Sequence, residues 1–163
     1  MRIGTCLILL VVGCGGSAGE PPPAPAAEVA GSIVTAALPP DCPFRFGATW
    51  ALETASSVRL PETGGTTDAA SVVTVIAHTS GSAPPSILYQ NNPTSCAAAT
   101  FPSSAPMTAI GSDPEGDGFS GIIPAFPIGT HVCWKLAVPV CGVTAASAPA
   151  GLPAFDYTTV QAR

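Results

Sequence analysis

The chain has 163 residues, a formal net charge of −5 and a charged fraction of only 9%. Its few cations are scattered, whereas a nucleic-acid-binding surface needs clustered lysine and arginine side chains to neutralise phosphates. Composition therefore excludes nucleic acid as a partner. Because charges are scarce, uncharged side chains must supply most of the polar surface, which suits an extracytoplasmic β-protein.

The first thirteen residues predict a secretory signal peptide. Met1-Arg2 supplies one positive charge, and residues 3–12 are mostly apolar. A helix of ten residues is about 15 Å long, roughly half the thickness of a bilayer's hydrocarbon core, so the segment is too short for a transmembrane span. A short apolar core followed by a small residue is typical of a signal that is removed from the mature protein.

The four residues Val11-Val12-Gly13-Cys14 follow this apolar core and resemble the lipobox of bacterial lipoproteins. The resemblance implies a diacylglycerol on the Cys14 sulfur, cleavage of residues 1–13 and acylation of the new amine. Two or more acyl chains anchor a protein stably in a membrane. The expected location is therefore the cell envelope, and Gly15 in place of aspartate favours the outer membrane. The alternative is an ordinary secreted protein.

Residues 14–31 are rich in glycine, proline and alanine and predict a disordered tether. Glycine and serine make the first part flexible, and the prolines favour an extended polyproline II conformation in the second. The segment has too little hydrophobic sequence to build a core. We expect it to hold a folded domain, residues 32–163, away from the lipid surface.

Short runs of β-branched residues bounded by turn residues predict an all-β domain, because helical periodicity does not survive the prolines and glycines. The clearest strand places Val73, Val75 and Ala77 on one face. Another places Trp134 in the core and Cys133 on the opposite face. The predicted strands are residues 46–50, 57–60, 72–78, 87–90, 107–110, 119–123, 130–138 and 154–160.

Residues 117–125, residues 129–137 and the strand around Val75 resemble parts of bacterial immunoglobulin-like and fibronectin-III-like modules. The shared features are a glycine-aromatic strand, an Ile-Pro corner, a Gly-Thr turn and an alternating strand with a central aromatic. The resemblance spans residues 72–137 and departs at residues 138–141. It implies an immunoglobulin-like antiparallel sandwich and an extracellular, non-catalytic module for spacing, adhesion or ligand binding.

Four cysteines remain once Cys6 and Cys14 are set aside, an even number that predicts two disulfides in an oxidising compartment. Their spacing does not match a zinc site. Three connectivities are open, and we favour a local bridge between Cys133 and Cys141 with a longer one between Cys42 and Cys96.

Catalysis is not expected. The two histidines, His78 and His131, fall at outward strand positions, and the sequence lacks the Gly-x-Ser-x-Gly motif of a nucleophile elbow. We expect no cofactor. The alternating acids Asp113, Glu115 and Asp117 resemble the first half of a calcium loop, but Pro124 stands where the bidentate glutamate belongs. A plain acidic hairpin turn is therefore the favoured interpretation.

The leading functional hypothesis is a lipid-anchored, non-enzymatic envelope protein that binds a partner protein or another envelope component. The membrane is its first partner, through the lipid on Cys14. The runner-up is a carbohydrate-binding module, for which Trp50 and Tyr89 are the candidate ligand-facing aromatics. A small enzyme is the least favoured alternative. An exposed apolar patch would favour the protein partner, and an exposed aromatic row would favour the sugar.

Overall fold

The computed structural model describes residues 32–33, 38–81 and 83–162, so the predicted signal, the tether and Cys14 lie outside the described residues. Apart from one short 3-10 helix, η1, the regular structure within these ranges is entirely β-strand. The elements are β1 Ser32–Ile33, β2 Phe46–Glu53, β3 Val58–Leu60, β4 Gly65–Asp68, β5 Val73–Thr79, β6 Ser86–Asn91, η1 Cys96–Ala98, β7 Ser103–Pro106, β8 Thr108–Asp113, β9 Gly116–Ile123, β10 His131–Val140, β11 Val143–Ala148 and β12 Phe155–Val160.

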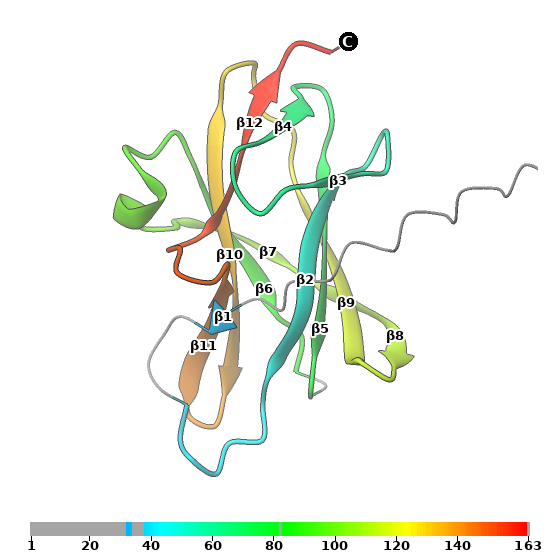
Figure 1. Cartoon of the computed structure of the whole chain (residues 1–163), viewed down its shortest axis with the longest axis vertical. Coiled ribbons are helices and arrows are strands. Elements are labelled where there is room, and N and C mark those ends of the chain that lie inside the picture. The colour runs from blue at the N-terminus through cyan, green and yellow to red at the C-terminus, as the bar shows by residue number, and fades with distance from the viewer. Residues whose placement is uncertain (1–31, 34–37, 82, 163) are drawn as a thin grey trace, which may run out of the picture.

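The strands form two sheets packed face to face, as expected for a sandwich (Figure 1). The five-stranded sheet has the order β3-β2-β5-β9-β8. In the seven-stranded sheet, β10 is central: β6 pairs along one edge, while β11 and β12 share the other. The strands β7, β1 and β4 extend this sheet beyond β6, β11 and β12, respectively.

One strand pair departs from the predicted antiparallel arrangement. β4 runs parallel to β12, with Tyr157 opposite Gly65 and Val160 opposite Asp68. Parallel neighbours need a long connection, and here most of the domain lies between the two strands in sequence. The all-β two-sheet prediction is confirmed, and the expectation of purely antiparallel pairing is wrong at this pair.

The core lies between the sheets and is built on β10. Val132, Trp134, Leu136 and Val138 alternate along the strand and are all buried, as their spacing predicts. The Trp134 ring stacks on Phe155 of β12 with the ring centroids 4.2 Å apart. A two-residue period therefore fixes which face of this central strand enters the core.

The predicted disulfide pairing is wrong. The bonds join Cys42 to Cys141 and Cys96 to Cys133. Cys133 lies within β10 and Cys141 directly follows this continuous strand. Eight residues of extended chain span about 26 Å, far beyond the reach of a disulfide. Cys133 lies on the face of β10 opposite Trp134, as predicted, and its partner there is Cys96 in η1.

Tyr157 is a buried residue of β12 whose hydroxyl has no hydrogen-bond partner in the described part of the chain. Burial raises the pKa of Tyr157, with a smaller contribution from Tyr89. An unpaired buried hydroxyl loses its bonds to water without replacement. We expect Tyr157→Phe to leave the free energy of unfolding unchanged or raise it by up to about 1 kcal/mol in urea denaturation. A loss of stability would contradict this expectation.

Glu53, on β2, joins the edges of the two sheets. Its carboxylate accepts hydrogen bonds from the Ser56 hydroxyl at 2.5 Å, the Asp68 backbone N–H at 2.6 Å and the Thr67 hydroxyl at 2.9 Å. These bonds, that of Ser56 above all, lower the pKa of Glu53 from its ordinary value of 4.5. The unfolded chain therefore binds a proton on Glu53 at a higher pH than the folded chain does.

Stability supplied by Glu53 should be present above its ordinary pKa and be lost as the pH falls through the lowered folded value. Glu53→Gln should remove this part of the acid sensitivity. Denaturant titrations at neutral and acid pH will test the prediction, since the difference in stability between wild type and variant should shrink in acid. A difference independent of pH would show that the carboxylate charge is not involved.

Candidate binding surface

The outer face of the five-stranded sheet is the best candidate for a functional surface. The strand register decides which side chains lie side by side on this face. Trp50 lies opposite Ile76, and Thr74 lies opposite both Leu52 and Ile122. The inward neighbours of these residues, such as Val75 and Ile123, are fully buried. We call the following residues the outer sheet face: Trp50, Leu52, Arg59, Thr74, Ile76, His78, Thr108, Ile110, Ser120 and Ile122. Ile110 lies in the irregularity between Ala109 and Gly111, and its side chain reaches this face beside Gly118.

The centre of the outer sheet face is apolar. Ile110 and Ile122 are 58% and 52% exposed, and Leu52, Trp50 and Ile76 are partly exposed. A sheet with one face in water normally carries polar side chains on that face. Several branched aliphatic side chains gathered on one solvent-facing sheet are therefore a feature that needs a partner or a functional reason.

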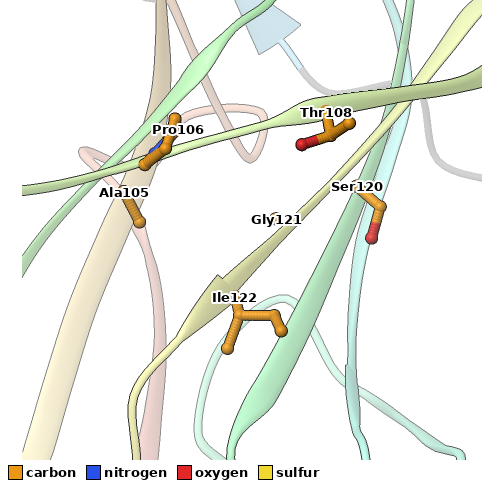
Figure 2. A pocket seen from close by; sticks show the side chains of 6 residues that line it. All are labelled: Ala105, Pro106, Thr108, Ser120, Gly121 and Ile122. Carbon is orange, nitrogen blue, oxygen red and sulfur yellow. The ribbon is translucent and has the colours of Figure 1, made fainter.

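A hollow of about 380 Å³ adjoins this face where the chain passes from β7 to β8 and so changes sheets. Figure 2 shows the segment carrying Pro106 and Thr108 crossing β9, with Ser120 nearest the crossing and Gly121 and Ile122 further along β9. A Cβ at Gly121 would come within 2.8 Å of Ile87 and 2.9 Å of Met107. Glycine thus permits the close crossing that forms one wall of the hollow.

Charged and polar groups flank the apolar centre. The Arg59 guanidinium lies 5.3 Å from the centre of the Trp50 ring, a cation–π contact near β3. Toward the β8–β9 hairpin, the His78 ring lies 5.6 Å from Trp50, and its Nε2 is 3.1 Å from Asp113 Oδ2. The surface therefore has a cation on one side and carboxylates on the other.

The acidic turn does not gather its three carboxylates into one cluster. Asp113 accepts a hydrogen bond from the Glu115 N–H, Glu115 approaches His78 Nδ1 at 3.6 Å, and Asp117 accepts from the Ser112 hydroxyl. Gly116 has a φ of 129°, and a Cβ there would overlap the Thr79 carbonyl oxygen. The predicted calcium candidates thus belong to a hairpin whose acids mainly contact His78 and neighbouring polar groups.

The two candidate aromatics do not share a surface. Trp50 belongs to β2 of the five-stranded sheet, whereas Tyr89 belongs to β6 of the other sheet and packs against Phe126 with the ring centroids 6.1 Å apart. Both are partly buried. The structure therefore brings Trp50 together with aliphatic side chains and leaves Tyr89 elsewhere.

Both histidines project from outer sheet faces, as predicted, and each side chain contacts a carboxylate. The His78 side chain is only 10% exposed because the acidic hairpin covers it. His131 Nε2 lies 3.0 Å from Asp156 Oδ2. Within the described residues, neither imidazole has a hydrogen bond to a serine hydroxyl, as a Ser-His-Asp site would require.

Sequence reasoning missed the outer sheet face as a unit. The available signal was the presence of Ile76 and Ile122 at outward positions of strands whose inward residues were already apolar. Which strands lie side by side cannot be read from the alternation pattern, so the residues could not be assembled into one surface.

Comparison of the chain with family models, curated proteins and solved structures gives no match. Within the described ranges, the structure contains no helix with the length and apolar character to cross a bilayer. The function of the protein must therefore be inferred from its own residues.

Proposed function

We propose that this protein is a lipid-anchored, non-enzymatic envelope lipoprotein whose immunoglobulin-like sandwich binds a protein partner through the outer sheet face. The observation that carries the proposal is the exposed apolar centre of that face, with Ile110 and Ile122 more than half exposed. Apolar side chains flanked by charged groups are a common composition for protein-binding surfaces.

The anchor and the cell-envelope location rest on the lipobox-like residues 11–14. The two disulfides support export, because such bonds persist mainly in oxidising compartments. The anchor is tested by Cys14→Ser in the full-length chain. We expect the variant to lose palmitate labelling and to leave the membrane fraction. Unlabelled wild type, or a variant that remains membrane-bound, would contradict the anchor without bearing on the binding surface.

Binding is tested by capture of cross-linked envelope components with the full-length protein. Ile122→Asp should abolish capture of a protein partner, because it places a charge in the apolar centre. Ile128→Asp is the matched control: Ile128 is 64% exposed in the loop between β9 and β10 and lies outside the outer sheet face. Equal capture by the two variants would contradict the proposed surface. Capture of a polysaccharide that persists in Ile122→Asp would instead support the carbohydrate-binding alternative.

A further inference from the structure

A second cluster of reactive groups lies on the outer face of the seven-stranded sheet. His131 and Cys133 are two residues apart in β10 and therefore share a face. Asp156 of β12 is the direct cross-strand neighbour of Cys133. Cys96 reaches the cluster from η1, in the loop that projects from this sheet in Figure 1, and forms the disulfide with Cys133.

The imidazole of His131 lies against both sulfurs of this disulfide. Its Nε2 is 4.0 Å from Cys96 Sγ and 3.9 Å from Cys133 Sγ. The same atom lies 3.0 Å from Asp156 Oδ2. Because a carboxylate can only accept a hydrogen bond, Nε2 carries a hydrogen. A donor N–H therefore stands beside the bond that joins the two cysteines.

The ring is fixed in this position. Asp156 uses its other oxygen to accept the Gly64 N–H at 3.3 Å, and the backbone N–H of His131 donates to Asn92 Oδ1 at 2.9 Å. Asp156 is thus a positioning residue for His131. The donor is held beside the disulfide before any reaction occurs.

The two sulfurs belong to residues that differ in accessibility. Cys133 is fully buried, whereas Cys96 is partly exposed. The His131 side chain, 35% exposed, lies next to both. A thiolate arriving from solvent would reach Cys96 first, and the leaving sulfur would then be Cys133, beside the imidazole N–H.

We propose that Cys96–Cys133 is a site of thiol–disulfide exchange. A thiolate attacks Cys96 Sγ and forms a new S–S bond, the Cys96–Cys133 bond breaks, and its electron pair remains on Cys133 Sγ. His131 Nε2–H, shared with Asp156, stabilises this leaving thiolate as a hydrogen-bond donor, and water supplies the proton that converts it to a thiol. The product is a mixed disulfide on Cys96 with a free thiol at Cys133. A second thiolate that attacks the outer sulfur of the mixed disulfide releases a disulfide of the two incoming thiols and leaves Cys96 reduced.

The other disulfide supplies an internal comparison. Near Cys42–Cys141, the Arg45 guanidinium donates to the carbonyl oxygens of Cys42 and Phe44, not to a sulfur. The chain's two histidines are both engaged elsewhere, His78 at the acidic hairpin and His131 at the exchange site. Leaving-group stabilisation by an imidazole is therefore a property of Cys96–Cys133.

The test treats the folded, full-length oxidised protein with reduced glutathione, followed by alkylation and peptide mapping. We expect a glutathionyl group on Cys96 and an alkylated Cys133 while Cys42–Cys141 remains intact. His131→Asn should slow adduct formation roughly tenfold, because the shorter asparagine side chain does not place its amide N–H at the position of the imidazole Nε2 beside the leaving thiolate. His78→Asn, the same substitution at the other histidine, should react like wild type.

Two results would overturn the proposal. One is an adduct that forms first on Cys42 or Cys141, a measurement that needs only the wild-type protein. The other is equal rates for His131→Asn and His78→Asn when thermal melts show both variants folded. His131→Gln, whose longer side chain can place an amide N–H near the position of the imidazole Nε2, should recover part of the rate, whereas a purely structural role for the ring predicts no recovery.

Discussion

Trp134→Ala should lower the free energy of unfolding by about 3–5 kcal/mol, the usual cost of removing a large aromatic side chain from a core. Trp134 is 2% exposed and stacks on Phe155 between the two sheets. Its replacement leaves a cavity bordered by a central strand that is paired along both edges and has little freedom to move inward. The neighbouring side chains would lose their packing contacts with the indole ring, and the structure could not relax enough to replace them.

Urea denaturation of the non-reduced protein will measure this loss. Trp50→Ala is the matched control because Trp50 lies on the outer sheet face and remains partly exposed. We expect the Trp50 variant to lose clearly less stability, since water already reaches one side of its ring. Equal losses would show that Trp134 is not the packing centre of the sandwich.

Removal of the Cys42–Cys141 disulfide, by Cys42→Ala with Cys141→Ala, should cost about 4–5 kcal/mol. The two cysteines are 99 residues apart in sequence, so the bond closes a loop that includes most of the domain. Chain-entropy estimates for a loop of about that length give roughly 4.7 kcal/mol from restriction of the unfolded chain. The bond also ties the segment before β2 to the β10–β11 turn.

The second disulfide provides the control. Cys96 and Cys133 are 37 residues apart, and the same estimate predicts a cost about 1 kcal/mol smaller for the equivalent alanine pair. Guanidinium denaturation of both double variants without reductant will compare them. A larger loss from the Cys96 and Cys133 substitutions would mean that contacts around η1 contribute more than loop closure does.

The two disulfides therefore have different proposed roles. Cys42–Cys141 closes the longer loop and mainly restricts the unfolded chain. Cys96–Cys133 lies on an outer face beside His131, where it combines a structural link with the proposed exchange chemistry. Neither bond borders the outer sheet face, so the protein-binding proposal and the exchange proposal can succeed or fail independently.

Strands with strong alternation were predictable, and those with small or polar residues were not. β5 and β10 were assigned with the correct buried face, because branched and aromatic residues recur at every second position. β4, β7 and β11, with the sequences Gly-Thr-Thr-Asp, Ser-Ser-Ala-Pro and Val-Thr-Ala-Ala-Ser-Ala, were missed. Their pairing with neighbouring strands makes them β, and local sequence carries little sign of it.

The candidate sites were also only partly predictable from the sequence. The sequence identifies an even set of four cysteines, and places Cys133 and His131 on one face of a strand. It does not identify Cys96 and Asp156 as their neighbours, since these come from η1 and β12. The local bridge between Cys133 and Cys141 is excluded by the observed extent of β10, which continues to Val140, two residues beyond the predicted strand, and carries the chain beyond the reach of a disulfide.

By itself, the sequence determined the β class, the buried face of the clearest strands, the number of disulfides and the hairpin at the acidic turn. These features depend on the two-residue period of a strand and on the local chemistry of turns. The tertiary structure alone decided the disulfide partners, the parallel pairing of β4 with β12 and the assembly of Ile110, Ile122 and Trp50 on one face. These three features depend on which strands become neighbours in the folded sheets. Contacts between residues far apart in sequence decide that arrangement, and local sequence patterns do not specify it.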